Sequence, residues 1–344
     1  MRSNNVLGFI FAATLDDKIP ELASSRTTAS VPIGGKYRII DFDLSNMSNS
    51  GISNVGIVAK SNFQSLMDHV GSGSAYDLSK RRSNLSILPP YDGKAFSSFV
   101  ETIYNMHGYI EHCREEYVLI SQGNVITNID YTDVFDFHSK KKADITLIYK
   151  NHAIPQGYDR PITLDVDNDG KVNQIFVKPG VVDKGVFNHA YGSILIKKDL
   201  LMSEIRNAIS VNQLDVRRLI QSSLGKYSIY AYENKGYCAA ISSINDYFEF
   251  NMDLMKKEVR DELFNPQRPI YTKVRDDAPS RYGLTSNVKN SIIAQGCVIN
   301  GDVENCVISK GVYVGEGAKL SNCIVMQDTK IGCNTNLNYV IIDK

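Results

Sequence analysis

Three cations near the N-terminus have the chemistry needed to bind a phosphate group, and they are Arg26, Lys36 and Arg38. The planar guanidinium fork of arginine suits phosphate, and lysine supplies a point charge. The alternation of residues 37–42 also suits a structural role, in which Arg38 pairs with Asp41 or Asp43. Phosphate binding and structural pairing both stay open at this point.

The turn after the first predicted strand lacks the glycines that a phosphate-binding loop needs. Glycines let backbone amides approach phosphates closely, and carboxylates hold the divalent metal that accompanies them. No glycine occurs between Gly8 and Gly34, and residues 13–18 read ATLDDK. We expect these bulky or charged side chains to obstruct a close approach to a triphosphate.

The composition excludes several classes of protein. Hydrophobic residues make up 43% and charged residues 22% of 344 positions, which is typical of a globular chain with two domains. Basic and acidic residues balance at 38 each, so nothing favours nucleic acid. No apolar run approaches the roughly 20 residues of a membrane span. Six cysteines without a Cys-x-x-Cys pair predict free thiols in a reducing cytoplasm.

Short apolar runs alternate with helical patterns up to about residue 251. Strands are predicted at Val6–Ala12, Val55–Ala59, Tyr117–Ser121, Asp144–Tyr149, Gly192–Ile196 and Ser228–Tyr232, and helices at Asn62–Val70, Phe99–Cys113, Tyr131–Lys140, Leu200–Ile209 and Ile244–Val259. A turn at Asn168-Asp169-Gly170 predicts a hairpin between Ile162–Val166 and Val172–Val177. This alternation predicts an α/β domain with a mostly parallel sheet that is covered on both faces.

The periodicity changes after a proline-containing connector. Ile308, Val314, Leu320 and Met326 recur every six residues, with Val312, Ala318 and Ile324 two residues earlier in each repeat. A six-residue repeat rich in β-branched residues and glycine predicts a left-handed parallel β-helix. The predicted domains are therefore 1–263, a linker at 264–284 and a β-helix at 285–344, whose last coil we expect to be incomplete at the C-terminus.

The block at 31–52, VPIGGKYRIIDFDLSNMSNSGI, resembles the signature of ADP-glucose pyrophosphorylases (glucose-1-phosphate adenylyltransferases). These enzymes join ATP and glucose 1-phosphate into the sugar nucleotide used for glycogen and starch. The most specific parts of this resemblance are residues 34–42, 43–46 and 49–52. The resemblance extends over nearly the whole chain. It implies a Rossmann-like, GT-A-like nucleotidyltransferase domain followed by a left-handed β-helix.

The resemblance also implies that catalytic positions are degenerate. Asn124 and Ala240 stand where the family places metal-binding aspartates, and Thr28 replaces a lysine that serves the pyrophosphate. Phe99, in the segment that corresponds to the adenine-side helix, adds bulk where the nucleotide would lie. We therefore assign no catalytic residue and expect this chain to bind no metal.

The resemblance implies that some residues of the family's sugar-phosphate binding site are retained. Lys178 resembles the lysine that binds glucose 1-phosphate, although a solvated lysine at a strand end is an equal alternative, and Tyr191-Gly192 lies at the next sugar contact. Arg26, Lys36 and Arg38 correspond to a region that helps to bind phosphorylated effectors near the contact between the two domains.

The resemblance thus implies a non-catalytic regulatory subunit. Its expected partner is a catalytic ADP-glucose pyrophosphorylase subunit that carries the Mg²⁺, in a hetero-oligomer that we expect to be a tetramer, and a homo-oligomer is the alternative for the chain alone. A sugar phosphate is the expected effector.

Three other functions remain as alternatives. An active sugar-1-phosphate nucleotidyltransferase would need to hold its metal through Asp16, Asp17 or Asp130. A hexapeptide-repeat acyltransferase would need a histidine base on the β-helix, whereas the last histidine is His189. A carbohydrate-binding or scaffolding protein would bind sugar without affecting a partner.

Overall fold

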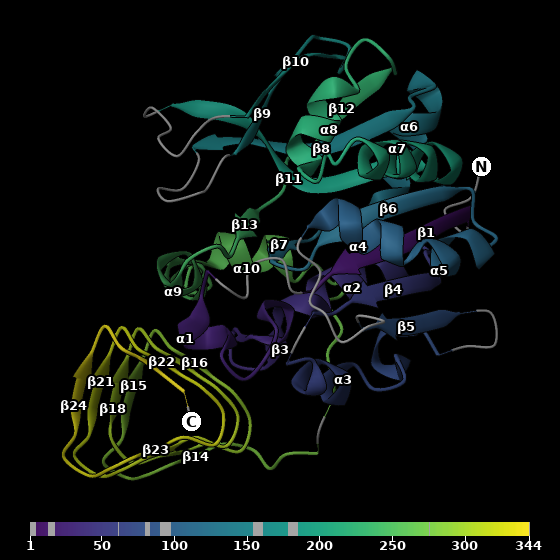
Figure 1. Cartoon of the computed structure of the whole chain (residues 1–344). Helices are drawn as coiled ribbons and strands as arrows, with labels where there is room; N and C mark the ends of the chain where they lie inside the picture. The colour runs from purple at the N-terminus through teal and green to yellow at the C-terminus, as the bar shows by residue number, and fades with distance from the viewer. Residues whose placement is uncertain are drawn as a thin grey trace.

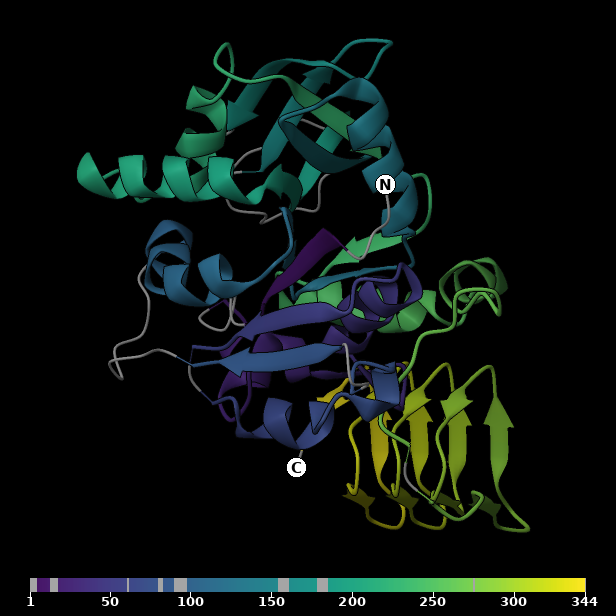
Figure 2. The same cartoon turned by 90° about the vertical axis from the view of Figure 1, so that its right-hand side faces the viewer.

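The computed structural model describes residues 5–12, 18–60, 62–79, 83–89, 98–153, 161–177, 185–274 and 276–343. A sheet domain forms the N-terminal part, and a β-helix of three short sheets forms the C-terminal part (Figures 1 and 2). Both parts of the predicted fold class are confirmed. Among the described residues, none of the helices is long and apolar enough to cross a bilayer.

The sheet domain is built around parallel strands at one side of a mixed sheet. These strands are β1 (Val6–Phe11), β4 (Asn54–Val58), β5 (Asn84–Leu88) and β6 (Tyr117–Gln122), in the order β6-β1-β4-β5. Every residue of β1 is buried, as expected for a central strand with both faces covered. The carboxyl ends of β1 and β6 lie side by side, because Phe11 pairs with Gln122.

The other side of the sheet contains the strands β8 (Ile145–Ala153), β9 (Ile162–Val166), β10 (Val172–Val177), β11 (Val186–Lys197) and β12 (Ile229–Glu233). The long strand β11 runs antiparallel to β6, β8 and β9, whereas β12 is parallel to β8. The predicted hairpin is confirmed as β9 and β10 with the same bounds. The antiparallel pairing of β11 is a feature that the alternation of elements does not predict.

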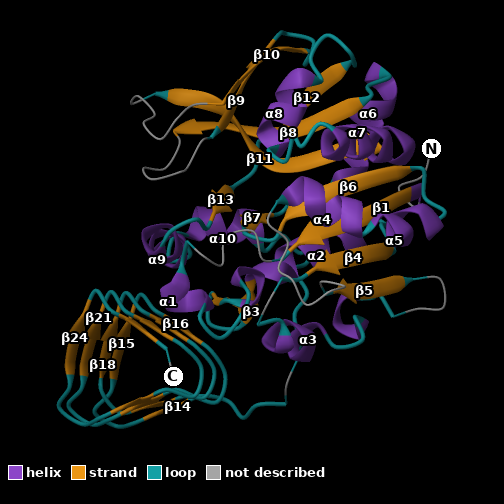
Figure 3. Cartoon of the chain, in the orientation of Figure 1, coloured by secondary structure: helices purple, strands orange, loops and turns teal. Residues whose placement is uncertain are grey.

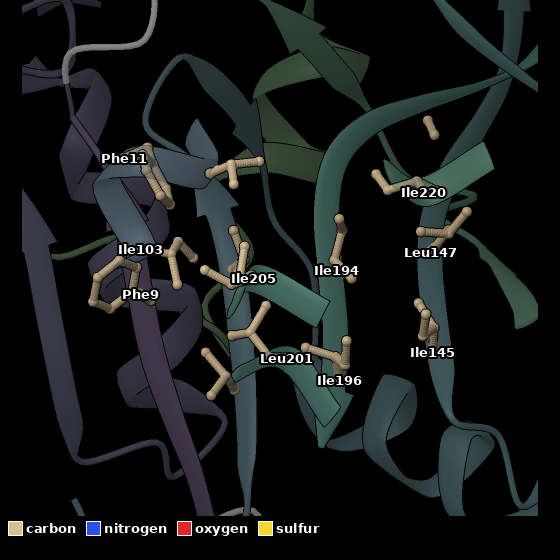
Figure 4. Packing of buried hydrophobic residues seen from close by; sticks show 14 of the residues in the cluster. Phe9, Phe11, Ile103, Ile145, Leu147, Ile194, Ile196, Leu201, Ile205 and Ile220 are labelled. Carbon is tan, nitrogen blue, oxygen red and sulfur yellow. The ribbon is translucent and has the colours of Figure 1, made fainter. Parts of the chain in front are cut away.

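Helices cover both faces of the sheet (Figure 3). One face packs against α4 (Phe99–Asn105), α5 (His107–His112), α7 (Lys198–Ser210) and α8 (Val216–Ser222), and the other against α2 (Ile39–Asn49), α3 (Gln64–Val70) and α6 (Tyr131–Lys141). Figure 4 shows the first face, where Leu201 and Ile205 of α7 meet Ile194 and Ile196 of β11. Shorter elements are α1 (Pro20–Ala23), two 3-10 turns (Thr28–Ser30 and Ser74–Tyr76) and the strand pair β2 (Pro32–Ile33) and β3 (Tyr37–Arg38).

Several predicted bounds need correction. The helix predicted at 99–113 is two helices, because the chain bends at Met106, and the helix predicted at 244–259 is α9 (Ile244–Asp253) and α10 (Lys257–Leu263). The strand β5 and the helices α2 and α8 are not predicted from the sequence. The alternation at residues 37–42 does not correspond to a single strand, because β3 ends at Arg38 and α2 begins at Ile39.

The β-helix stacks its strands in three parallel sheets. The first sheet contains β14 (Arg281–Tyr282), β17 (Val298–Ile299), β20 (Tyr313–Val314) and β23 (Lys330–Ile331), in this order. The second contains β15 (Asn287–Lys289), β18 (Asp302–Glu304), β21 (Lys319–Ser321) and β24 (Asn336–Asn338). The third contains β16 (Ile292–Ile293), β19 (Val307–Ile308), β22 (Ile324–Val325) and β25 (Ile341–Ile342). All seven positions singled out by the step of six are buried. The first strand, β14, lies inside the stretch predicted as linker.

Asparagines with positive φ form one corner of successive coils. Asn290, Asn305 and Asn322 have φ angles of 40°, 53° and 52°. Asparagine tolerates this left-handed conformation better than most residues. Tyr339 has a φ of 54° at the corresponding corner of the last coil, and its side chain is 69% exposed. A bulky residue is strained in this conformation.

The two domains share an apolar contact. Ile19 and Leu22 of the sheet domain, with Phe250 of α9, belong to the same buried cluster as Ile324 and Met326 of the β-helix. Gly35 has a φ of 81°, and a Cβ atom there would lie 3.3 Å from the carbonyl oxygen of Ile308. The turn at Gly34-Gly35 therefore needs glycine both for its conformation and for its closeness to the β-helix.

Candidate functional site

A two-stranded ribbon places Asn124 and Ala240, the two positions predicted to be degenerate metal ligands, next to each other. Strand β7 (Val125–Thr127) pairs with β13 (Cys238–Ala240), so that Ala240 is opposite Val125. Asn124 lies directly before β7, and Ile241 directly after β13. The amide of Ile241 donates to the carbonyl oxygen of Asn124 (2.9 Å), which closes the end of the ribbon. The two positions were predicted to belong to one site, and the structure brings them together.

The side chains gathered at this point are neutral. Asn124 is 1% exposed, and its Nδ2 donates to the carbonyl oxygen of Ile241 (3.2 Å). Its Oδ1 is buried and accepts no hydrogen bond from the residues that the structure describes. Val125, Tyr191 and Ala240 form a small buried apolar cluster beside it. Within the described ranges, no group of three or more His, Cys, Asp or Glu side chains could hold a metal ion.

The retained carboxylate Asp130 is used to cap a helix. Its Oδ1 accepts from the amide of Thr132 (2.8 Å) at the start of α6 and from the Ser50 hydroxyl (3.4 Å). Asp246, the first carboxylate after β13, has a comparable structural role, because its Oδ2 accepts from the amide and hydroxyl of Ser242. The two other carboxylates proposed for a displaced metal, Asp16 and Asp17, lie outside the described residues.

Aromatic side chains pack together at the end of β1. The rings of Phe11 and Phe99 stack with centroids 4.5 Å apart. Gly123 packs against the same strand end, since its amide donates to the carbonyl oxygen of Phe11 (2.8 Å). Thr28, the third position predicted to be degenerate, is 1% exposed. The turn at residues 13–17, which was expected to obstruct a triphosphate, lies outside the described ranges.

The sugar-phosphate candidates have partners within the protein. The hydroxyl of Tyr191 lies 2.6 Å from Nε2 of His152, which in turn lies 3.3 Å from Nδ1 of His189. Burial lowers the pKa of His152 to about 4 and that of His189 to about 3, so both rings are neutral at pH 7. Gly192 has a φ of 85° and lies under the side chain of Gln122. Lys178 lies outside the described residues.

A second candidate site lies between the domains. It is a small cavity of about 60 Å³, lined on the sheet-domain side by residues of β3 and α3 and on the other by the connector and the β-helix. Four of its lining residues are cations, and they are Lys36, Arg38, Lys273 and Lys310. Such a concentration of positive charge suits a phosphate-sized anion.

The structure separates the three cations predicted to bind an effector. Lys36 and Arg38 line the interdomain cavity, but Arg26 does not line it and pairs with Asp343. The guanidinium of Arg38 donates to the carbonyl oxygen and hydroxyl of Ser65 (2.8 and 2.7 Å). Asp41, one of the two carboxylates suggested to pair with Arg38, accepts from the Arg38 amide (2.9 Å).

Two cations of this cavity were not predicted from the sequence. Lys273 lies in the connector, where its ammonium donates to the carbonyl oxygen of Asp68, and Lys310 follows β19 with its Nζ 3.6 Å from Asp277. No local motif marks either residue. Only the packing of the β-helix against the sheet domain brings them near Lys36.

Most polar residues of the 31–52 block bond to the scaffold. Asp41 is fully buried and lies 2.6 Å from both the His69 imidazole and the Tyr76 hydroxyl. Asn46 donates to the carbonyl oxygen of Thr127 (2.9 Å), and its Oδ1 accepts from the amide of Ile129 (3.3 Å). Further bonds join Ser45 to Tyr271 and Asn49 to Pro269. This block thus links α2 to the ribbon and to the connector.

Comparisons with known proteins agree with this fold. Residues 17–257 match the nucleotidyl transferase family, and residues 273–344 match the GlmU-like C-terminal hexapeptide family. The glycogen biosynthesis protein GlgD of Bacillus subtilis is 32% identical over all of this chain and 91% of its own length. Glucose-1-phosphate adenylyltransferases of Clostridium perfringens (strain SM101) and Bacillus cytotoxicus are 32% and 30% identical, over 96% and 99% of this chain and 87% and 92% of their own lengths. This chain belongs to the ADP-glucose pyrophosphorylase (glucose-1-phosphate adenylyltransferase) family of nucleotidyl transferases.

Proposed function

We propose that this chain is a non-catalytic regulatory subunit of ADP-glucose pyrophosphorylase that acts in glycogen biosynthesis in the cytoplasm. The observation that supports the proposal best is the buried apolar cluster of Val125, Tyr191 and Ala240 beside the neutral Asn124. A divalent cation needs carboxylate oxygens, and nucleotidyl transfer needs the cation to neutralise the triphosphate. The stacked rings of Phe11 and Phe99 also support the proposal, because they fill space at the end of β1 that a nucleotide would need.

The proposed partner is the catalytic subunit of the same cell, which would carry the Mg²⁺ and perform the synthesis of ADP-glucose. We expect a hetero-oligomer, with four chains as the expected size. A subunit without catalytic activity can change its partner's activity. If the interface is more stable in one conformation of the partner than in another, its formation shifts the partner's equilibrium towards that conformation.

The test is release of pyrophosphate from ATP and glucose 1-phosphate. This chain alone, the catalytic subunit alone and the mixture are measured at equal total protein. We expect no turnover by this chain alone and a changed kcat or KM in the mixture. Turnover by this chain alone, sensitive to chelators, would instead favour the alternative of an active enzyme with an altered metal site.

We further propose that the interdomain cavity binds the phosphate group of a sugar-phosphate effector. Lys36 is exposed and lies beside Arg38, Lys273 and Lys310. Because the cavity joins both domains, an anion there would change the free energy of their contact. Binding of inorganic phosphate and of a sugar bisphosphate can be measured by calorimetry. We expect Lys36→Ala and Lys310→Ala to weaken binding about tenfold each, and Lys319→Ala, which replaces an exposed lysine of β21, to leave it unchanged.

A further inference from the structure

A buried carboxylate holds the imidazole ring of His69 beside the interdomain cavity. Nε2 of His69 lies 2.6 Å from Oδ1 of Asp41, which is fully buried. The Tyr76 hydroxyl donates to the same oxygen (2.6 Å), and the Arg38 amide donates to Oδ2 (2.9 Å). A carboxylate that is itself held by several hydrogen bonds fixes the tautomer and the orientation of the imidazole that it contacts.

The other nitrogen of this ring is open. A carboxylate only accepts, so Nε2 carries the proton shared with Asp41, and Nδ1 of the neutral ring then carries a lone pair. Nδ1 has no hydrogen-bond partner in the described part of the chain, and it keeps accessible surface. His69 lines the cavity, whereas Asp41 does not. The ring therefore offers a nucleophilic nitrogen at the wall of the cavity.

Positive charge surrounds the same space. The cations that line it together with His69 are Lys36, Arg38, Lys273 and Lys310. Lys36 and Asp68, which also lines the cavity, are exposed, so a small molecule can enter from the solvent. The volume of about 60 Å³ suits a phosphoryl group and not a nucleotide. Fixed cations stabilise phosphoryl transfer, because the transferred group spreads its charge over three oxygens.

A structural tether between α2 and α3 would account for the bond between Asp41 and His69, but not for its surroundings. Such a tether needs neither an accessible, unpartnered ring nitrogen nor cations from two domains beside it. An oriented imidazole, a carboxylate behind the ring and positive charge in front of it are together what a histidine needs to attack phosphorus.

We propose that His69 is a phosphoryl acceptor, which a small acyl phosphate or phosphoramidate modifies at Nδ1. The lone pair of Nδ1 forms the N–P bond while the P–O bond of the acyl phosphate breaks, and the carboxylate leaves with the electron pair. With phosphoramidate the P–N bond breaks instead, and ammonia leaves. The ring keeps its proton on Nε2, where the charge of Asp41 balances the positive charge that the ring acquires. This modification rests on the proposed binding of phosphate in the cavity, but it does not require the regulatory role.

The test compares three histidines of the same protein. The purified chain is incubated with potassium phosphoramidate or acetyl phosphate, quenched at alkaline pH, where phosphohistidine persists, and its peptides are analysed by mass spectrometry. We expect His69 to gain a phosphoryl group at least about tenfold faster than His107 and His112. Exposure alone would give the opposite order, because His69 is 8% exposed and the other two side chains are exposed.

A pair of lysine variants tests the role of the cavity. Lys36→Ala replaces an exposed side chain, so the fold is kept, and it should slow the labelling of His69 about tenfold. Lys319→Ala, which replaces an exposed lysine of β21, is the matched control and should leave the rate unchanged. Phosphorus NMR of the labelled chain should show attachment at Nδ1.

Labelling of His69 no faster than that of His107 and His112 would overturn the proposal. Attachment at Nε2, or a rate that Lys36→Ala leaves unchanged, would do the same. Calorimetry with inorganic phosphate separates this failure from that of the effector site. Phosphate binding that Lys36→Ala weakens, without labelling of His69, would overturn the phosphoryl acceptor and support the effector site, whereas the absence of both would overturn both proposals.

Discussion

Arg26 and Asp343 are 317 positions apart in the sequence and form an ion pair between the two domains, with Nη2 and Oδ2 2.5 Å apart. The side chains are only 16% and 26% exposed, and Met326 of the β-helix lies against the same guanidinium. The pair therefore holds the end of the β-helix against the segment that follows α1. Arg26 has a structural partner at the place where an effector phosphate was expected.

Arg26→Ala should lower the free energy of unfolding by about 1 kcal/mol, because the pair is partly shielded from water. The loss should change little at high salt, because partly buried charges are screened much less than exposed ones. Arg206→Ala is the matched control, because Arg206 pairs with Glu111 on the surface, where both side chains are well exposed. Equal effects of the two replacements in chemical denaturation would contradict a special role for the domain contact.

Asn124→Asp combined with Ala240→Asp should not create an enzyme. Both positions are buried, and the carboxylate introduced by Asn124→Asp would face the carbonyl oxygen of Ile241 that now accepts from the asparagine amide. We expect a loss of stability of roughly 2 kcal/mol or more and no pyrophosphate release above that of the parent chain. A large gain of turnover would show that the turn at residues 13–17 does not obstruct the nucleotide.

The carboxyl of Asp43 should make stability fall as the pH rises. Burial raises its pKa to about 7, although the Ser121 hydroxyl donates to it (2.5 Å). A group whose folded pKa lies above its unfolded value, near 4, stabilises the protein fully below that value. Its contribution is lost between about pH 4 and pH 7.

Asp43→Asn should therefore flatten the dependence of stability on pH over that window. Above about pH 7 the variant should be the more stable protein, by an amount on the order of a few kcal/mol. Urea unfolding at about pH 5, 6, 7 and 8 measures the difference across the window. Asp136→Asn, at an exposed position of α6, serves as the control and should leave the slope unchanged. Parallel pH profiles for the parent and Asp43→Asn would refute this account.

Tyr339→Asn should stabilise the last coil of the β-helix. Relief of the left-handed strain is worth about 1–2 kcal/mol, and it is partly offset by the lost contact with the Phe248 ring, whose centroid is 5.9 Å away. We expect a net gain of about 0.5–1 kcal/mol in thermal unfolding. Tyr282→Asn, which changes an exposed tyrosine in β14 with ordinary φ, should show no gain.

Periodic features could be predicted from the sequence, and long-range partnerships could not. The step of six places Val314 and Leu320 in the β-helix core because each coil repeats the same geometry. The continuous apolar run at 6–12 predicts β1 because a central strand is buried on both faces. By contrast, α2 was missed because its polar positions are buried and bonded, which removes the amphipathic pattern.

The candidate site shows the same limit. The adjacency of Asn124 and Ala240 could be predicted only through a family resemblance, since the two lie on different strands of the ribbon. The hydroxyl partner of Tyr191, His152, comes from the neighbouring strand β8 and leaves no local signal. Lys310 joins Lys36 only after the β-helix has packed against the sheet domain.

The closeness of Gly35 to the carbonyl oxygen of Ile308 has a consequence for how such chains are recognised. The block that most resembles an enzyme signature is held in place by packing, so the fold needs it whether or not the chain turns over substrate. A gene copy freed from catalysis would keep this block while its metal positions drift. A match to this block therefore reports the packing of the two domains rather than turnover.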